Sequence, residues 1–172
     1  AKRAMKNVAD IVEAGWTVVL THGNGPQVGY ILRRSELALD ELHPVPMDYA
    51  GADTQGAIGY MFQKALRNEF VRREMPHNVI TIVTQVRVSA DDSAFVTPTK
   101  PIGSYMSQDH ARKMADEYGW SISEESGFGW RRVVPSPYPE DIIEFEPIKE
   151  MVTTENVVIA CGGGGIPVVE RG

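Results

Sequence analysis

Apolar residues in the first half of the chain alternate between helical spacing and short continuous runs. Gly15 would end a first helix over residues 1–14, and the run at 16–21 (WTVVLT) is typical of a strand buried on both faces. Helical spacing returns over 26–39 and over 54–74. The helix over 1–14 is amphipathic, because one side of it would carry Ala4, Met5, Val8, Ile11 and Val12. This alternation predicts an α/β fold with a mainly parallel sheet.

The second half holds two further β-runs around an irregular stretch. The strongest β-pattern covers 79–88 (VITIVTQVRV), and a second buried strand is predicted over 156–161. Between them, 89–130 is rich in proline and glycine, with one helix predicted over 107–118. We interpret this stretch as an excursion from the sheet, and we expect 131–134 to return to the main body.

The composition favours a single globular domain and disfavours nucleic-acid-binding and membrane-spanning proteins. At 172 residues, with 42% hydrophobic and 23% charged residues, the chain is typical of one globular domain that buries roughly 70% of its unfolded surface. Cys161 is the single cysteine, which excludes an intrachain disulfide and favours a reducing compartment. The net charge of −6 disfavours nucleic acid as a partner. The apolar runs are shorter than the roughly 20 residues that a membrane-spanning helix needs, and we see no signal peptide.

Two predicted strands lead into glycine-rich loops, THGNGPQVG at 21–29 and CGGGGIPV at 161–168. Ligands of open α/β sheets bind at the carboxyl ends of parallel strands, and glycine lets backbone N–H groups approach a phosphate. The first loop also begins a helix, whose free N–H groups favour an anion. Each loop alone is explained equally well by a tight turn, but the two together favour a phosphate site.

Standard nucleotide motifs fit this site poorly. The sequence has no GxxxxGK[ST] motif, which excludes a P-loop. Gly23, Gly25 and Gly29 form only a variant of the dinucleotide fingerprint. The acidic residue that should end the next strand is missing, because that region contains Pro44 and Pro46. A dinucleotide site is therefore not predicted.

Several motifs together resemble the carbamate kinases, a family of the amino-acid kinase superfamily. They cover essentially the whole chain in the family's order: THGNGPQVG, ADTQGAIGYM, TQVRV, PTKPIG, GWRRVVPSP and ACGGGGIPVV. The resemblance implies a three-layer αβα sandwich with a mainly parallel sheet and a small protruding subdomain. It also implies a cytoplasmic homodimer that interconverts carbamate plus ATP with carbamoyl phosphate plus ADP.

The resemblance also implies how the chain is divided. Residues 1–172 would be the N-terminal, carbamate-binding part of an amino-acid kinase domain, with 89–130 as a protruding lid subdomain. We expect the family's first strand to precede this sequence and its nucleotide-binding half to follow it, so these residues alone should be inactive. The cofactors would be ATP or ADP with Mg²⁺. No metal ligand is assigned, since nucleotide phosphates would hold most of the magnesium.

The resemblance assigns roles to residues of both loops and to one lysine. The backbone amides of Gly23, Asn24 and Gly25 would bind carbamate or the moving phosphoryl group, and Lys100 in PTKPIG would close over the acceptor as a mobile cation. Asn24 and Lys100 are the catalytic candidates. The second loop would approach from the neighbouring strand through Gly162, Gly163, Gly164 and Gly165. Without the flanking motif, Lys100 would be interpreted as an exposed loop residue.

Other polar residues are weaker candidates. His22 lies beside the proposed site but is not needed as a base, because carbamate is already ionised. The family pattern places Thr54 and Gln55 at the active-site or dimer surface, although Thr54 is also explained as a helix cap. Two pairs of adjacent charged residues are the remaining candidates. Arg131 and Arg132 would point in opposite directions on a strand and cannot serve one anion, whereas Asp91 and Asp92 are typical of a solvated turn.

Two other functions remain open from the sequence. Cys161 and His22 both follow predicted strands and could form a thiolate–imidazole hydrolase site. Alternatively, the chain could be a kinase-like domain that binds anions for regulation and transfers nothing.

Overall fold

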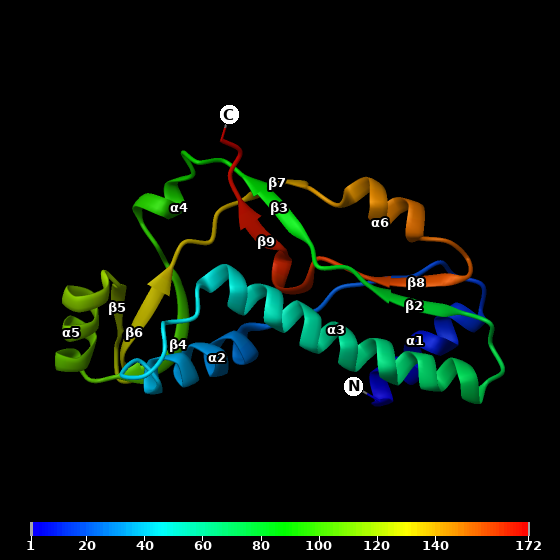
Figure 1. Cartoon of the computed structure of the whole chain (residues 1–172), viewed down its shortest axis with the longest axis horizontal. Helices are drawn as coiled ribbons and strands as arrows, with labels where there is room; N and C mark the ends of the chain where they lie inside the picture. The colour runs from blue at the N-terminus through cyan, green and yellow to red at the C-terminus, as the bar shows by residue number, and fades with distance from the viewer. Residues whose placement is uncertain (1, 172) are drawn as a thin grey trace.

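The computed structural model describes residues 2–171, which form three small sheets and their covering helices (Figure 1). The first sheet has the order β1-β8-β2 and consists of β1 (Val19–Leu20), β8 (Asn156–Ile159) and β2 (Asn78–Thr81). Both pairings are parallel, with Val158 of β8 opposite Val19 on one side and Ile80 on the other. The predicted parallel sheet is confirmed, with β8 as its central strand.

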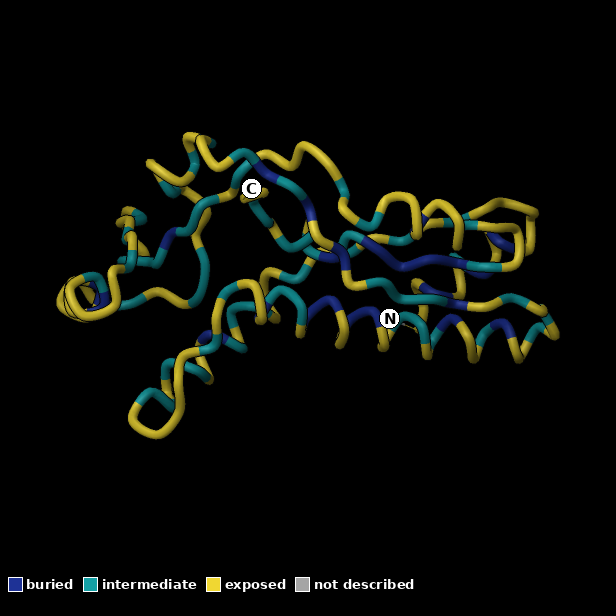
Figure 2. Tube along the Cα trace, turned by 45° about the horizontal axis from the view of Figure 1, so that its top comes forward, coloured by how far each residue is buried: buried dark blue, intermediate teal, exposed yellow. Residues whose placement is uncertain are grey.

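The first sheet lies between two helix layers, because the side chains of β8 alternate between its two faces. Val157 and Ile159 pack on one face of the sheet, against the helices α1 (Lys2–Glu13) and α3 (Met47–Arg72). Val158 and Ala160 pack on the other face, against Ile148 of α6 (Phe145–Met151). Successive residues of a strand point to opposite faces, so a fully apolar β8 requires a helix layer on each side. Figure 2 shows the buried segments along these strands and on one side of α3, and the αβα fold class is confirmed.

The expected strand at 16–21 is shorter and more exposed than predicted. Only Val19 and Leu20 are in β1, and the side chains of Trp16 and Val19 are 69% and 51% exposed. The reason is position, because β1 stands at the edge of its sheet and pairs only with β8 among the described residues. The prediction of a strand buried on both faces is therefore correct for β8 and wrong for β1.

The apolar run at 79–88 is two strands in two different sheets. β2 ends at Thr81, and β3 (Gln85–Val88) lies between the antiparallel β7 (Pro139–Ile142) and the parallel β9 (Ile166–Val168). The break centres on Thr84, whose N–H donates to the side-chain oxygen of Gln55 at 2.7 Å instead of to a strand neighbour. The buried side chain of Gln55 in α3 thus takes the hydrogen bond of Thr84 at the point where the chain leaves the first sheet and enters the second.

The excursion contains a sheet of its own. β4 (Lys100–Met106), β6 (Gly129–Val134) and β5 (Ser121–Glu125) form an antiparallel sheet in the order β4-β6-β5. α5 (Gln108–Tyr118) packs on it through Ala111 and Met114. The expectation that 131–134 returns to the main body is wrong, because these residues belong to β6 and pair with β4 and β5. The lid role of 89–130 stays a prediction.

The helix boundaries agree with the sequence in part. Ser107 caps α5 by accepting the N–H of His110, as the predicted start at 107 requires, and Gly15 follows α1 with a φ of +88°. α3 starts at Met47, directly after Pro46, rather than at Thr54. On α1, Met5, Ala9 and Val12 are buried, whereas the predicted core residues Ala4 and Ile11 are exposed.

The pair Asp91 and Asp92 is only partly a solvated turn. Asp92 caps the short helix α4 (Ser93–Val96) by accepting the N–H of Ala94 at 2.8 Å, and it also accepts the N–H of Tyr138 at 2.9 Å. These two bonds, that of Tyr138 first, lower the pKa of Asp92. Asp92 therefore ties the excursion to the segment before β7.

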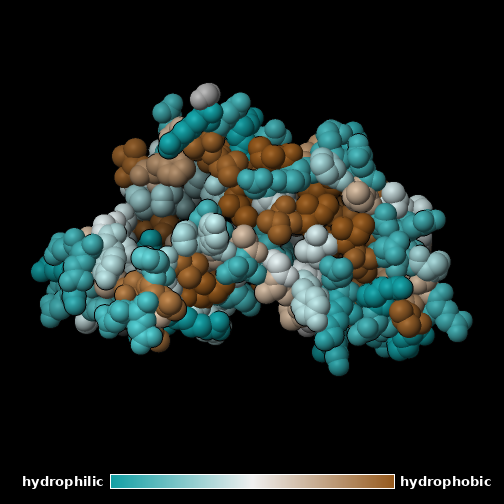
Figure 3. Space-filling model, viewed as in Figure 1, coloured by the Kyte–Doolittle hydropathy of each residue, from teal (hydrophilic) through white to brown (hydrophobic). Residues whose placement is uncertain are grey.

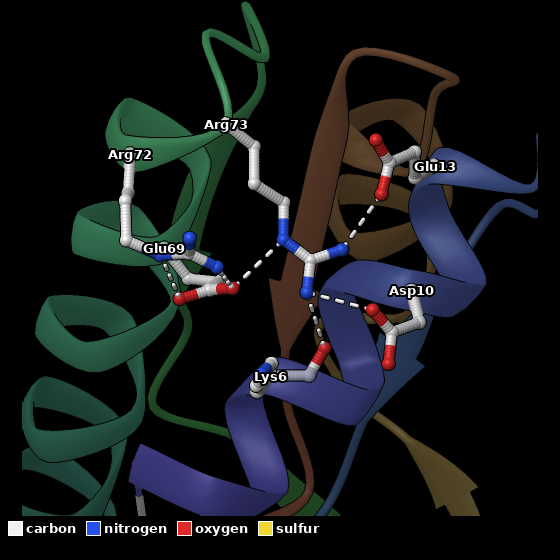
Figure 4. A network of polar contacts seen from close by, with 6 residues as sticks. All are labelled: Lys6, Asp10, Glu13, Glu69, Arg72 and Arg73. Carbon is white, nitrogen blue, oxygen red and sulfur yellow. Dashed lines mark hydrogen bonds and ion pairs between the residues drawn. The ribbon is translucent and has the colours of Figure 1, made fainter.

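An ionic network joins α1 to the end of α3 (Figure 4). Arg73 follows α3 and pairs with Glu69, Asp10 and Glu13, each at 2.7 Å, while Arg72 makes a second pair with Glu69. The Arg72 and Arg73 guanidinium groups, as hydrogen-bond donors, lower the pKa of Glu69 to about 2. The network holds α1 against α3 above their shared apolar contact.

Substituting Arg73 with methionine should weaken the fold and change its acid sensitivity. The folded-state pKa of Glu69 lies below its ordinary value of 4.5, so its contribution is complete above about pH 4.5 and is lost as the pH falls toward about 2. We expect Arg73→Met to lower stability at pH 7 and to flatten this part of the pH profile, measured by urea unfolding. Arg34→Met, at an exposed arginine of α2, is the matched control. An unchanged profile would contradict the assignment.

Among residues 2–171, no helix combines the length and apolarity that crossing a membrane requires. Figure 3 shows apolar side chains across the middle of one face, in the band between α3 and α6.

Candidate functional site

The two glycine-rich loops lie side by side at the carboxyl ends of β1 and β8. Leu20 and Ile159 are opposite each other in the sheet, so the chain leaves both strands at the same edge. The N–H of Gly163 donates to the carbonyl of His22 at 2.7 Å, and the Thr21 hydroxyl donates to the carbonyl of Cys161 at 3.0 Å. The sequence-based prediction that the two loops meet is confirmed.

Close approach between the loops requires glycine at two positions. A Cβ on Gly162 would stand 2.5 Å from the imidazole of His22. A Cβ on Gly163 would stand 2.3 Å from the amide nitrogen of Asn24, and the φ of Gly163 is +67°. Both distances are shorter than van der Waals contact, so the glycines let the second loop pack directly on the first.

The first loop presents unused backbone donors at a helix start. α2 (Gly25–Leu37) follows directly, with Pro26 in its first turn. The N–H groups of Gly23, Asn24 and Gly25 donate to no acceptor within residues 2–171. Unpaired N–H groups at the positive end of a 13-residue helix favour an anion.

Most backbone N–H groups of the second loop already have an acceptor. Cys161 has a left-handed φ of +54°, and Gly162–Gly164 form a 3₁₀ turn, η1. The amides of Gly163, Gly164 and Gly165 donate to the carbonyls of His22, Cys161 and Gly162. The role of this loop in binding phosphate therefore stays a prediction, and it would require an exchange of these bonds.

Asn24 is held by α3 rather than by its own helix. Its side-chain amide donates to the hydroxyl of Thr54 at 2.9 Å, and that hydroxyl donates to the carbonyl of Gly51 at 2.8 Å. Asn24 occupies the N-cap position of α2 but makes no capping bond from its side chain. Thr54 is a buried residue inside α3, so its interpretation as a helix cap is wrong. The hydroxyl instead orients the first loop.

Gln55 connects the second loop to the gap between β2 and β3. Its side chain is only 2% exposed and makes three hydrogen bonds to backbone. The amide nitrogen donates to the carbonyls of Thr84 at 3.1 Å and Gly162 at 3.0 Å, and the amide oxygen accepts the N–H of Thr84 at 2.7 Å. Thr84 in turn accepts the N–H of Cys161 through its hydroxyl at 2.9 Å. Gln55 and Thr84 thus fix the position of the second loop.

Lys100 lies on the excursion, apart from these contacts. It is the first residue of β4, where it is exposed and pairs through its backbone with Val134. β4 packs against α2, and Gly29 of α2 approaches the backbone of Gly103. Within the described part of the chain, the Lys100 ammonium forms no ion pair. Its action over the site stays a prediction.

The geometry does not favour a cysteine–histidine hydrolase. Nδ1 of His22 lies 3.1 Å from the carbonyl of Gly23, and its ring packs edge-on against Phe62. Burial and the nearby charge of Glu144 raise the pKa of Cys161, which disfavours the thiolate. No hydrogen bond joins the two side chains within residues 2–171. His22 is thus a packing residue between the loops and α3.

The adjacent arginines have separate surroundings, as their alternation predicts. Arg131 donates to the carbonyl of Gly103 at 2.9 Å and lies over the ring of Tyr105. Arg132 lies over the ring of Trp120, with its guanidinium carbon 4.5 Å from the ring centre. The two do not converge on one anion.

The described residues contain no group of three or more His, Cys, Asp or Glu side chains that could hold a metal ion.

Comparison with known proteins places these features in a family. No family model matches the chain. It is 49% identical over 173 aligned positions to the carbamate kinase of Pyrococcus horikoshii, covering 99% of this chain and 55% of that protein. An Aeropyrum pernix K1 structure matches with a TM-score of 0.95 at 39% identity, over 99% of this chain and 55% of that one. The carbamate kinase of Giardia lamblia bound to AMP-PNP matches with a TM-score of 0.90 at 41% identity, over 99% and 54%.

The matched relatives are all longer than this chain, which spans about half of their length. Identity is spread over 99% of the chain rather than confined to one motif. The sequence motifs, the three-layer fold and these matches agree, and the chain belongs to the carbamate kinase family.

Proposed function

We propose that the protein that carries these residues is a carbamate kinase, which transfers a phosphoryl group reversibly between ATP and carbamate. In the direction of ATP formation, the bond between phosphorus and the carbamate oxygen breaks, and a bond forms to a terminal phosphate oxygen of ADP. The products are carbamate and ATP. Carbamate is an ionised leaving group in this direction, so the reaction needs no general acid or base from the protein.

One observation supports this proposal above the others, namely the interlocked glycine loops at the sheet edge. They place the unpaired amides of Gly23, Asn24 and Gly25 at the start of α2, in a chain whose relatives are carbamate kinases. Phosphoryl transfer depends on holding anionic groups in line and neutralising charge on the moving oxygens. Rigid backbone donors perform both tasks without a rearrangement during the reaction.

The proposed roles follow from this arrangement. The amides of Gly23, Asn24 and Gly25 hold carbamate or the moving phosphoryl group, with Asn24 fixed in place by Thr54. Gly162 to Gly165 form the neighbouring wall, which Gln55 holds in position. Lys100 approaches from β4 of the excursion and closes over the acceptor. No residue of this chain is assigned to adenine, ribose or Mg²⁺.

We further propose ATP and ADP as the nucleotides, with Mg²⁺, and a cytoplasmic homodimer, as the family resemblance implies. The Giardia relative with bound AMP-PNP supports the choice of nucleotide. For the dimer, α3 offers an outer side that carries the exposed side chains of Tyr49, Tyr60 and Val71. Sedimentation of the complete protein tests the oligomeric state.

Replacing Gly25 with valine should impair transfer far more than folding. No atom lies within 4 Å of the position that a Cβ would take, so the fold accommodates the side chain. The branched side chain would nevertheless occupy the space where the amides meet the anion, and we expect kcat/KM to fall by about 100-fold. The measurement is ATP formation from carbamoyl phosphate and ADP by the complete protein.

Gly56→Val is the matched control, at an exposed glycine of α3 that also has no atom within 4 Å of its Cβ position. This control should keep its activity. Normal kcat/KM for Gly25→Val would exclude the anion role of the first loop. Absence of ATP formation by the unmodified protein, with carbamoyl phosphate still bound in calorimetry, would instead support a regulatory anion-binding domain.

A further inference from the structure

A cavity of about 240 Å³ lies between α2 and the sheet of the excursion. One wall comes from the second half of α2 and the loop that follows it, up to Met47. The other comes from α5, from Trp120 between α5 and β5, and from Arg132 of β6. The residues that matter for its chemistry are Leu32, Ser35, Glu36, Met114, Trp120 and Arg132. No residue of either glycine-rich loop lines it, so this cavity is separate from the proposed active site.

Arg132 supplies a charge to this cavity without an acidic partner. Its side chain is half-buried, and its guanidinium lies over the ring of Trp120. Among residues 2–171, Arg132 makes no hydrogen bond from its side chain and no ion pair. Burial lowers its pKa and the charge of Glu36 raises it, but a guanidinium stays protonated at neutral pH.

Glu36 is the acidic side chain on the cavity wall, and it already has a partner. Its carboxylate pairs with the Arg33 guanidinium at 3.1 Å, and the Glu36 side chain is 20% exposed. The hydroxyl of Ser35 is likewise occupied, because it accepts the N–H of Val45 at 2.8 Å. Glu36 acts on Arg132 only through its charge. The guanidinium of Arg132 is therefore the polar group of this cavity that has no hydrogen-bond or ion-pair partner within residues 2–171.

The rest of the wall is mostly apolar. Leu32 and Met114 are 6% and 5% exposed and belong to the two opposite sides. Tyr118 and Leu39 extend these apolar sides. The volume equals the share of about eight water molecules in liquid water, which suits a compact organic molecule rather than a single ion.

We propose that this cavity binds a small carboxylate with an apolar body. The carboxylate pairs with the guanidinium of Arg132, whose planar donors match two carboxylate oxygens. The apolar body fills the space between Leu32 and Met114. A neutral molecule of the same shape would leave the half-buried charge unpaired, so the site discriminates by charge.

Binding also has a mechanical consequence, since the two walls belong to different parts of the molecule. α2 starts at the first glycine-rich loop, and β6 pairs with the strand that begins at Lys100. A ligand between them stabilises the arrangement in which α2 and the excursion are in contact. It should therefore raise the thermal unfolding midpoint of the chain, and above the Kd this rise should grow with the logarithm of the ligand concentration.

The test uses benzoate as the probe and the complete protein. In ¹H–¹⁵N spectra, we expect saturable shifts of the indole N–H of Trp120, whereas that of the exposed Trp16 stays unchanged. Benzamide, which has the same shape and no charge, should bind at least tenfold more weakly. Arg132→Met should weaken benzoate binding at least tenfold and remove its effect on the unfolding midpoint.

Arg112→Met, at an exposed arginine of α5, is the control and should bind benzoate normally. Equal binding of benzamide and benzoate would overturn the proposal, as would full affinity in Arg132→Met or the absence of a saturable shift at Trp120. If Arg132→Met does not fold, the comparison of benzoate with benzamide on the unmodified chain decides the question. None of these outcomes depends on kinase activity.

Discussion

Replacing Gln55 with leucine is expected to lower the free energy of unfolding by about 3 kcal/mol. The substitution keeps the size of the side chain but removes three hydrogen bonds to backbone. The carbonyls of Thr84 and Gly162 each keep one other donor, from Ile166 and Gly165. The N–H of Thr84 keeps none within the described residues, and a buried unpaired N–H costs about 1–3 kcal/mol.

Urea unfolding of the 172-residue chain measures this effect, with Gln27→Leu at an exposed position of α2 as the control. The control should change stability by less than about 0.5 kcal/mol. The second loop should also loosen in Gln55→Leu, seen as faster amide exchange at Gly163, whose N–H bonds to His22. Equal stabilities of the two variants would show that the buried amide does not support the loop.

The layers of the fold could be predicted because apolar periodicity reports burial. The continuous apolar run of β8 requires cover on both faces, and the helical stripe of α1 supplies part of it. The same pattern misled at β1, because an apolar run does not reveal whether a strand is central or at an edge. It also misled at 79–88, where the break between β2 and β3 depends on Gln55, which is distant in the sequence.

The backbone arrangement of the candidate site, with two glycine-rich loops side by side, could be predicted from the sequence. Two glycine-rich runs after two strands indicated the meeting of the loops, since parallel strands end at one edge. The family pattern placed Thr54 and Gln55 near the site, but their roles were not predictable, because both hold the loops through tertiary hydrogen bonds rather than through local spacing. One signal was present in the sequence, since the adjacent polar residues Thr84 and Gln85 interrupt the β-run at 79–88.

Lys100 has a position that a mobile cation would need, which makes its contribution testable. It is exposed at the start of β4, and β4 packs on the helix that begins at the first loop. No ion pair within residues 2–171 restrains the ammonium, so movement toward the site breaks no existing contact of that kind. A lysine enclosed with the reacting phosphoryl group is worth more than one on the surface, because water no longer screens its charge.

Lys100→Ala should therefore lower the turnover of carbamoyl phosphate in the complete protein by roughly 150-fold, equivalent to about 3 kcal/mol in the barrier. The KM for ADP should stay nearly unchanged, since in its proposed role the lysine contacts the acceptor and not the base or ribose. Lys113→Ala, at an exposed lysine of α5 in the same excursion, is the matched control and should keep full turnover. An equal loss in ADP binding and in turnover would assign Lys100 to the nucleotide. Full activity of Lys100→Ala would show that Lys100 is not needed, and that the backbone amides of the first loop neutralise the transferring group alone.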